Sequence, residues 1–502
     1  MGAIDTVEPG AVERDFSRVD RVALIAELRS ILPPAALLVD HEDLKPYECD
    51  GLAAYREMPL LVALPDDETQ VVAILKACRR LGVPVVARGA GTGLSGGAMP
   101  HKFGLLLSLA KFKRIIKVDP VARLAVVQPG VRNLAISEAA SPYGLYYAPD
   151  PSSQIACTIG GNVAENSGGV HCLKYGLTVH NLLRVRGVTI DGEIVEIGNH
   201  ALDAPGYDLL ALITGSEGML AVTTEVTVKL VPKPQLAVCL LAAFDDVAKA
   251  GNAVADVIAA GIIPAGLEMM DQGATVAVEE YVRAGYPLDA KAILLCEADG
   301  TPDEVAEEVE RMKAVLGRSG ATEMRVSRSE AERLRFWSGR KAAFPAAGRL
   351  SPDYYCYDGT VPRKRIAGLL EAIAELEKKY GLRCINVFHA GDGNMHPLIL
   401  FDANVKGELA RVEAFGAEIL EMSVALGGTI TGEHGVGFEK INQMCTQFRT
   451  AEIRAFHRIK AAFDPDGLLN PGKAIPTLNR CAEYGRMHVS GGQVAHPELP
   501  RF

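Results

Sequence analysis

Two short stretches that contain glycine carry the residues with the clearest chemical potential. HAGDGNMH places His389 and His396 around a glycine-containing turn, and TGEHGVG places Glu433 next to His434. Two imidazoles and one carboxylate suit a divalent metal ion that keeps open coordination positions. A single histidine would more often be structural, so the hypothesis requires that the two stretches meet. Strands on both sides of a tight turn can bring the two histidines of the first stretch together.

The composition is typical of a globular protein with more than one domain. The chain has 502 residues, of which 48% are hydrophobic and 23% are charged. The net charge of -10, without long runs of one sign, argues against a partner such as nucleic acid or an anionic membrane. No uncharged apolar run reaches the roughly 18 residues that a membrane-spanning helix needs. The N-terminal stretch MGAIDTVEPGAVERDF lacks the apolar segment of a signal peptide. We therefore expect a cytoplasmic protein that has no direct membrane span.

The ten cysteines are scattered along the chain, and none forms a C-x-x-C pair. This spacing argues against a zinc ribbon and against a ferredoxin-type cluster. Cys157 and Cys172 lie in a glycine-rich region, but they have no further cysteines near them in the sequence. We expect reduced and mostly buried thiols.

Periodicity predicts the elements that must position these motifs. Helical spacing is expected at residues 21–32, 361–381 and 406–428, and two strands are expected to flank HAGDGNMH. Another helix is expected to begin after Asp66 or Asp67, with apolar positions at Val71, Ile74, Leu75, Cys78 and Leu81, and to end at Gly82. Residues 182–198 read as a hairpin with Asp191–Gly192 at its turn, and a proline pair indicates a domain boundary near residue 234.

The loop RGAGTGLSGG, residues 88–97, contains a literal G-x-G-x-x-G after an apolar strand. A dinucleotide-binding Rossmann loop must open a crossover helix. Here AMPHKFG and the strand-like LLLSL follow instead, so the nicotinamide interpretation fails. Backbone N–H groups that wrap a diphosphate, with Arg88 at the mouth of the loop, explain the glycines better. The glycine-rich and asparagine-rich residues 149–176 and the stretch TGSEGM suit a flat cofactor that forms hydrogen bonds.

The set RGAGTGLSGG, PDPSSQIACTIGGNVAENSGG, KYG and TGSEGMLAVTTEVTVKL resembles the FAD-binding domain of the vanillyl-alcohol-oxidase (PCMH) type, and LNPGK resembles the family's ending. Within that superfamily, the chain from about residue 46 onward resembles the flavoprotein subunits of glycolate oxidases, in the D-2-hydroxy-acid dehydrogenase branch. The resemblance implies FAD, and the glycine loop lacks the histidine that binds FAD covalently in some relatives, so we expect non-covalent binding. The FAD-binding residues expected on this basis are Arg88, Gly89, Ala90, Gly91, Thr92, Gly93, Leu94, Ser95, Pro149, Asp150, Ser152, Thr158, Gly160, Gly161, Asn162, Asn166, Gly168, Gly169, Tyr175, Glu217, Gly218 and Asn470.

The same resemblance implies roles for the residues of the two opening stretches. His389, His396 and Glu433 would hold a divalent metal ion (zinc, manganese or iron), and His434 would be the catalytic base. Arg340, in the segment that contains the only tryptophan, is our choice for binding the substrate carboxylate, because a guanidinium binds carboxylates through two parallel hydrogen bonds. YYCYDG offers no additional lysine, which favours a small monocarboxylate. The expected reaction is oxidation of glycolate, and also of D-lactate, to the 2-oxo acid, with hydride transfer to flavin N5.

The predicted fold is a PCMH-type FAD-binding domain joined to a ferredoxin-like α+β substrate (cap) domain with a C-terminal helical return. We expect an N-terminal helical or extended segment at 1–55, the FAD domain at 56–234, the cap domain with the metal site at 235–440, a return segment that packs on the FAD domain at 441–480, and a tail at 481–502.

The resemblance further implies partners that accept the electrons. These are a second FAD-binding-type subunit and an iron–sulfur subunit that leads to the quinone pool, which would place the complex at the inner face of the plasma membrane. Two alternatives remain. One is a self-sufficient D-lactate or D-2-hydroxyglutarate dehydrogenase, and the other is a non-catalytic flavin scaffold or electron relay. The complete pair HAGDGNMH and GEHG argues against a scaffold.

Overall fold

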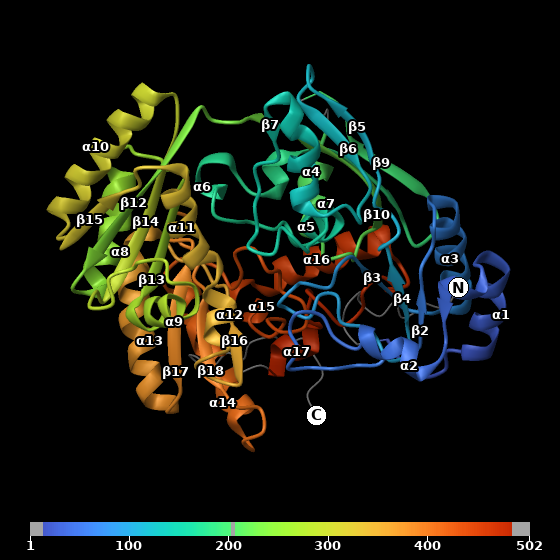
Figure 1. The fold of residues 1–502 in the computed structure, drawn as a ribbon. Helices are drawn as coiled ribbons and strands as arrows, with labels where there is room; N and C mark the ends of the chain where they lie inside the picture. Colours follow the sequence, from blue (N-terminus) through green and yellow to red (C-terminus); the bar gives the residue numbers. More distant parts are fainter. Residues whose placement is uncertain (1–13, 202–205, 484–502) are drawn as a thin grey trace.

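The computed structural model describes residues 14–201 and 206–483 and shows two lobes with the C-terminal helices between them (Figure 1). The N-terminal lobe contains a four-stranded, a five-stranded and a two-stranded sheet, and the second lobe contains one seven-stranded sheet. The tail expected after residue 481 lies almost entirely outside the described residues, as do residues 1–13 of the N-terminal segment.

The first sheet of the N-terminal lobe has the strand order β1-β2-β4-β3. Strands β2, β4 and β3 are parallel, and β1 pairs with β2 in the antiparallel direction. The apolar residues on one face of this sheet share a core with the inner faces of α1 and α3, and those on the other face form a smaller core with Leu44. The bounds are β1 (Leu37–Leu38), β2 (Leu61–Ala63), β3 (Val85–Arg88), β4 (Leu105–Ser108), α1 (Arg21–Ile31) and α3 (Glu68–Leu81), with the short α2 (His41–Leu44) between β1 and β2.

Helix α3 forms where its periodicity and its end signals predict. The Asp67 carboxylate accepts the N–H of Gln70 and caps the first turn. Gly82 ends the helix with φ at +66°, a conformation that favours glycine. The positions Val71, Ile74, Leu75 and Cys78 are buried. The prediction of this helix is therefore confirmed, with Asp67 rather than Asp66 as its cap.

The second sheet is antiparallel, with the order β5-β6-β10-β8-β9. Its β8–β9 hairpin turns at Gly192, where φ is +73°, as the sequence predicts. The strands are β5 (Ile115–Asp119), β6 (Leu124–Val127), β8 (Leu182–Val188), β9 (Ile194–Gly198) and β10 (Val222–Lys229). The short elements around it are α4 (Asn133–Ala140), β7 (Leu145–Tyr146), α5 (Ile159–Glu165), α6 (Cys172–Tyr175), α7 (Leu209–Ile213) and β11 (Val231–Pro232), which pairs with β7.

The sheet of the second lobe begins as the predicted ferredoxin-like unit. The order β15-β12-β14-β13, all antiparallel, arises from the chain order β12, α8, β13, β14, α10, β15 with α9 inserted after β13. β13 then pairs with β17, which extends the sheet through β18 to β16. The strands are β12 (Leu236–Phe244), β13 (Gly266–Asp271), β14 (Ala292–Gly300), β15 (Glu323–Val326), β16 (Asp353–Cys356), β17 (Arg383–Phe388) and β18 (Pro397–Phe401).

Helices cover both faces of this sheet, because its central strands are apolar on both sides. In β12, Leu240 and Ala242 belong to one core, and Cys239 and Leu241 belong to the other. The first face carries α8 (Val247–Ala259), α10 (Pro302–Arg318), α13 (Ile366–Tyr380) and α14 (Glu408–Ala425). The second carries α9 (Gln272–Val282), α11 (Glu330–Lys341) and α12 (Ala343–Ala347). The helices expected at 361–381 and 406–428 are confirmed with shorter bounds.

The C-terminal helices are α15 (Met444–Gln447), α16 (Thr450–Phe463) and α17 (Leu478–Glu483), drawn in red in Figure 1. Their buried apolar residues belong to the first core of the second lobe, and the segment after α16 returns the chain to the N-terminal lobe. After α16, Leu469 lies beside Val85 of β3 as an isolated parallel bridge, and Leu468 and Leu469 are buried in the core of the first sheet. In residues 14–201 and 206–483, no helix combines the length and the apolar character needed to cross a membrane.

The thiols correct one expectation from the sequence. Cys445 and Cys481 form a disulfide that links α15 to α17, so the prediction of ten reduced cysteines is wrong for this pair. The other eight are free, and all of them except Cys49 are buried. The spacing of 36 residues gave no signal of this bond, because the return of α17 to α15 is a tertiary feature.

Candidate active site

A cavity of about 470 Å³ joins the glycine loop of the N-terminal lobe to the histidine motifs of the second lobe. The wall formed by the N-terminal lobe comes mainly from three glycine-rich segments, residues 87–98, 151–167 and 216–218. Its opposite wall includes His396, Glu433 and His434. One continuous space therefore contacts both sets of motifs that the sequence singles out.

The loop between β3 and β4 forms no helix, and the two strands it joins are parallel neighbours. The structure thus confirms that this G-x-G-x-x-G does not open a Rossmann helix. Arg88 anchors the loop because its guanidinium donates to the carbonyl oxygen of Cys49 at 2.6 Å. Gly91 has φ at +69°, and a Cβ at this position would lie 2.3 Å from Arg88 Nη2. A glycine is therefore needed where the loop crosses the arginine.

Many of the predicted FAD-binding residues line this cavity. They are Arg88, Gly89, Ala90, Gly91, Thr92, Gly93, Leu94, Ser152, Thr158, Gly160, Gly161, Asn162, Glu217 and Gly218. The others do not line it: Ser95, Pro149, Asp150, Asn166, Gly168, Gly169, Tyr175 and Asn470.

Several of this second group support the wall from behind. Ser95 Oγ donates to the carbonyl oxygen of His434 at 2.9 Å, and Asn470 Nδ2 donates to the carbonyl oxygens of Gly97 and Glu217. Tyr175 lies elsewhere, since its hydroxyl donates to Asp299 at 2.6 Å beside a second hollow between the lobes.

The two histidine-containing stretches do meet. The ligand atoms of His389, His396 and Glu433 all lie within 4.8 Å of one another. Glu433 Oε1 is 3.1 Å from His389 Nε2 and 3.2 Å from His396 Nε2. The Nδ1 atom of His396 is buried without a hydrogen bond to any described residue, and its Nε2 faces the Glu433 carboxylate without the geometry of a hydrogen bond. Buried nitrogens of this kind suit a bound cation.

The segment 357–361 holds the two stretches together and was missed by sequence reasoning. On one side it pairs with the end of the histidine turn, since Met395 N–H donates to Gly359 at 2.9 Å and Val361 N–H donates to Gly393 at 2.9 Å. On the other side Thr360 and Thr429 exchange backbone hydrogen bonds at 2.9 and 3.2 Å. This segment therefore connects, through backbone hydrogen bonds, the turn that carries His389 and His396 to the loop that carries Glu433.

Behind His389 lies a buried ion pair. Glu268, on β13, accepts from His389 Nδ1 at 2.7 Å through one oxygen and from Arg340 Nε at 2.7 Å through the other. Burial lowers the pKa of His389, but Glu268 and Glu433 outweigh it and raise the pKa to about 10. Arg340 is 1% exposed and does not line the cavity, whereas its neighbour Lys341 does.

The catalytic candidate His434 stacks on His396, with ring centroids 4.9 Å apart and planes inclined by 12°. Burial lowers the pKa of His434 to about 4, against the opposing effect of Asp358, so the ring is neutral at pH 7. A neutral imidazole that lines the cavity can accept a proton.

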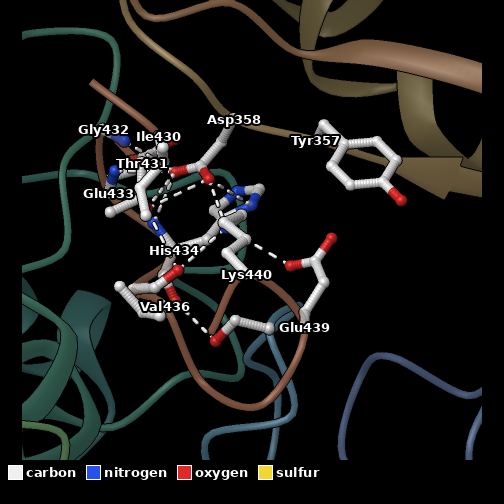
Figure 2. Close-up of polar contacts among 12 residues, drawn as sticks. Tyr357, Asp358, Ile430, Thr431, Gly432, Glu433, His434, Val436, Glu439 and Lys440 are labelled. Carbon is white, nitrogen blue, oxygen red and sulfur yellow. Dashed lines mark hydrogen bonds and ion pairs between the residues drawn. The ribbon is translucent and has the colours of Figure 1, made fainter. Parts of the chain in front are cut away.

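Two buried carboxylates, one from each lobe, accept backbone N–H groups of the loop of residues 430–437. Asp358 accepts hydrogen bonds from the N–H groups of residues 432–434 and forms an ion pair with Lys440 at 2.5 Å (Figure 2). Glu217 comes from the N-terminal lobe and accepts the N–H groups of Val436 and Gly437, each at 2.7 Å. Burial raises the pKa of Asp358, but Lys440 and His434 outweigh it and hold this pKa at about 2.

Sequence reasoning missed Asp358, Lys440 and Glu268, which do not line the cavity, and Glu165, which does. It chose Arg340 over the neighbouring Lys341, although Lys341 is the one that lines the cavity. Glu165 ends α5, directly before the predicted Asn166, and burial together with Glu217 raises the pKa of its carboxyl group well above the usual range. Its position inside a glycine-rich segment was an available signal. Glu268 and Asp358 offered none, because isolated acids in otherwise apolar stretches usually face solvent.

Comparison with known proteins bears directly on this cavity. Residues 59–198 match the family model described as FAD binding domain, and residues 233–474 match FAD linked oxidases, C-terminal domain. The glycolate oxidase subunit GlcD of Escherichia coli K12 is 64% identical over 484 residues, which cover 96% of this chain and 97% of the relative. The chain belongs to the FAD-linked oxidases. It is an FAD-dependent oxidoreductase, and these matches confirm the resemblance seen in the sequence.

More distant relatives extend the family. A D-lactate dehydrogenase of Anaerostipes hadrus is 31% identical to this FAD-linked oxidase, with 88% of the chain and 95% of the relative covered. The crystal structure of p-cresol methylhydroxylase with substrate bound superimposes with a TM-score of 0.76 at 17% identity, covering 91% of this chain and 97% of that one. The last similarity shows the fold alone, and it confirms the predicted PCMH-type architecture of the FAD-linked oxidase.

Proposed function

We propose that this chain oxidises a small 2-hydroxy acid, with glycolate as the main substrate and D-lactate as a second one, to the corresponding 2-oxo acid. The observation that carries the proposal is the continuous cavity that joins the glycine-rich wall, where we place FAD, to His396, Glu433 and His434. The names of the relatives, a glycolate oxidase subunit and a D-lactate dehydrogenase, support this substrate class.

The residues present fit both cofactors. The open glycine wall suits FAD held non-covalently, and bound FAD supplies a two-electron acceptor that takes hydride at N5. We assign His389, His396 and Glu433 to a divalent ion (zinc, manganese or iron), because two imidazoles and one carboxylate converge there. Such an ion lowers the pKa of a hydroxyl group beside it, and its charge would replace the positive charge that His389 otherwise carries between two carboxylates.

The reaction balances without any additional group. The substrate R–CH(OH)–COO⁻ would lose its hydroxyl proton to His434, and FAD held by the glycine-rich wall would supply the two-electron acceptor for the α-hydrogen and its bonding electron pair. The C–O single bond becomes the carbonyl of R–CO–COO⁻, which is glyoxylate when R is hydrogen. The low pKa of His434 keeps the ring free to accept the proton at neutral pH.

A cation must face the carboxylate of the substrate. We keep Arg340 as one candidate, since its Nη2 is buried without a hydrogen bond to any described residue. Lys341 is the second candidate, because it follows Arg340 on α11 and lines the cavity. Replacing each residue by methionine distinguishes them, because only the loss of the residue that binds the carboxylate should raise KM for glycolate.

The electrons must leave through a partner. The sequence has no C-x-x-C cluster motif, so we propose a complex with a second FAD-binding-type subunit and an iron–sulfur subunit that passes electrons to quinone. The complex would lie in the cytoplasm against the inner face of the plasma membrane. We also propose the division into an FAD domain at 56–234, a cap domain at 235–440 and a return segment at 441–480.

The test is anaerobic mixing of the FAD-loaded, metal-loaded chain with glycolate, D-lactate, L-lactate or D-2-hydroxyglutarate, followed at the visible flavin absorbance. Rapid bleaching by glycolate and D-lactate, without partner subunits, is the expected result. Faster reduction by D-2-hydroxyglutarate than by glycolate would favour a dehydrogenase of another substrate class. If no 2-hydroxy acid bleaches the flavin, the chain is a scaffold or needs a partner to complete its site.

A further inference from the structure

We propose that Asp358 is the positioning residue of the loop 430–437, because it accepts the backbone N–H groups that set the orientation of Glu433 and His434. The roles of Glu433 and His434 themselves rest on the proposed function. Asp358 lies outside both histidine-containing stretches and does not line the cavity, so it acts through the loop and not on the substrate.

The contacts of Asp358 converge on one carboxylate oxygen. Its Oδ2 accepts from the N–H groups of Gly432, Glu433 and His434, at 3.0, 2.9 and 2.8 Å (Figure 2). Thr431 Oγ1 adds contacts at 3.1 Å to Oδ1 and 3.0 Å to Oδ2. Three consecutive amides can point to one oxygen only if the peptide planes of this loop turn toward the same side. In that conformation the side chains of Glu433 and His434 line the cavity.

The charge of Asp358 is compensated where it lies. The carboxylate is 0% exposed, and a buried charge without a partner would be strongly destabilising. Lys440, also 0% exposed, provides the ion pair at 2.5 Å and donates to the carbonyl oxygen of Gly435 at 2.8 Å. The same lysine therefore neutralises Asp358 and fixes the glycine that follows His434.

The backbone of Asp358 links the loop to the histidine turn. Its carbonyl oxygen shares the N–H of Gly432 with its own Oδ2, at 2.8 and 3.0 Å, while the carbonyl oxygen of the next residue, Gly359, accepts the N–H of Met395. A Cβ on Gly432 would lie 2.4 Å from Asn394 Cγ, so the loop packs directly on that turn. A shift of Asp358 would move Glu433 relative to both histidines.

Two double variants separate the hydrogen-bond acceptor from the charge. Asp358→Asn/Lys440→Met keeps an acceptor oxygen but removes both charges, and Asp358→Leu/Lys440→Met removes the acceptor at similar volume without leaving a buried lysine unpaired. Glu439→Gln is the matched control, because Glu439 is buried beside Lys440, at 3.3 Å, but accepts none of the loop amides.

The measurements are FAD content, the rate constant of anaerobic flavin reduction by glycolate, the affinity for Mn²⁺ or Zn²⁺, and hydrogen exchange of residues 430–437. We expect wild-type FAD content in all variants, a rate within about 10-fold of wild type for the asparagine variant and the control, and a loss of about 100-fold or more for the leucine variant. Metal affinity should fall about 10-fold or more in the leucine variant only.

A leucine variant that holds FAD and is reduced by glycolate within about 3-fold of the wild-type rate would overturn the proposal. Equal slowing of both double variants would also overturn it, since the loss of Lys440, with its charge and its hydrogen bond to Gly435, would then explain the effect and not the loss of the acceptor. If the leucine variant does not fold, the asparagine variant decides. In that variant, the protection of the amides of residues 430–437 from exchange and the rate of flavin reduction must change together. Fast flavin reduction with unprotected amides, or slow reduction with protected amides, would contradict a positioning role of Asp358. If no 2-hydroxy acid reduces the flavin of the wild-type protein, the proposed function is wrong. Metal affinity and hydrogen exchange of residues 430–437 would still test whether Asp358 positions the loop.

Discussion

On the N-terminal side of the cavity the polar groups belong mainly to the backbone, whereas on the side of the second lobe they belong to buried side chains. The first wall consists of glycine-rich segments that are each nearly continuous in sequence. The second includes His396, Glu433 and His434, and buried side chains behind it support these residues: His389, Glu268 and Asp358, which come from different strands and loops. The first wall offers fixed dipoles to a large cofactor, and the second offers groups that can exchange protons or bind a cation.

The difference predicts separable effects of mutation. A substitution in the glycine wall should change how much FAD is bound and leave the chemistry of the loaded protein intact. A substitution in the wall of side chains should leave FAD bound and change the rate or the metal affinity. Each charge of the second wall also needs its partner, as the pairs Glu268–Arg340 and Asp358–Lys440 show.

The largest effect is expected for His434→Asn. Loss of the base should slow flavin reduction by glycolate about 10² to 10⁴-fold while FAD content stays at the wild-type level. Stopped-flow absorbance under anaerobic conditions measures both quantities on one sample. Flavin reduction at the wild-type rate would show that His434 is not the catalytic base.

Glu268→Gln tests whether the second wall depends on the carboxylate behind His389. Because this carboxylate orients the ring through Nδ1, metal affinity should fall about 10 to 100-fold. Titration with Mn²⁺ or Zn²⁺ in the presence of a competing chelator gives the affinity. Glu297→Gln is the matched control, since Glu297 is equally buried on neighbouring β14 but binds His171. Equal losses in both variants would mean that general stability, and not the orientation of His389, is affected.

Gly91→Ala tests the glycine wall. A left-handed alanine costs about 1 kcal/mol, and its Cβ would collide with Arg88, so FAD affinity should fall about 10-fold. Flavin fluorescence on dilution measures the affinity. The rate of reduction in the fraction that retains FAD should match wild type, and a slower rate there would end the distinction between the two walls.

The smallest effect concerns pH. His171 lies between Asp150 of the N-terminal lobe and Glu297 of the second lobe, at 2.8 and 3.1 Å, with Arg333 also on Glu297. Burial lowers the pKa of His171, but the two carboxylates outweigh it and raise this pKa to about 10. Its folded pKa exceeds the ordinary value of about 6.5, so its stabilisation is complete below pH 6.5 and is lost as pH rises toward 10.

Thermal unfolding should therefore show a decrease of Tm from pH 6.5 to 9.5 that is larger by about 2 to 4 °C in wild type than in His171→Gln. Parallel decreases in the two proteins would show that His171 carries no excess proton in the folded state.

The comparison of walls also explains what the sequence could predict. The glycine segments and the set His389, His396 and Glu433 were predictable, because each motif is compact and only their meeting required the fold. Asp358 and Glu268 were not, because an acid becomes a buried anchor only when a distant partner such as Lys440 or Arg340 packs against it. Tyr175 shows the converse, since it follows a glycine-rich motif but binds Asp299 away from the cavity.

The return of the chain after α16 has a consequence for biosynthesis. Asn470 and Lys473 donate to the carbonyl oxygen of Gly97, which precedes Asn470 by 373 positions. At typical synthesis rates of 5–20 residues per second, about 20 to 75 s separate the translation of Gly97 from that of Asn470. A nascent chain thus carries its glycine loop for most of its time on the ribosome without these donors. Loading with FAD is accordingly expected after release, and a cell short of flavin should accumulate complete apoprotein and not shortened chains.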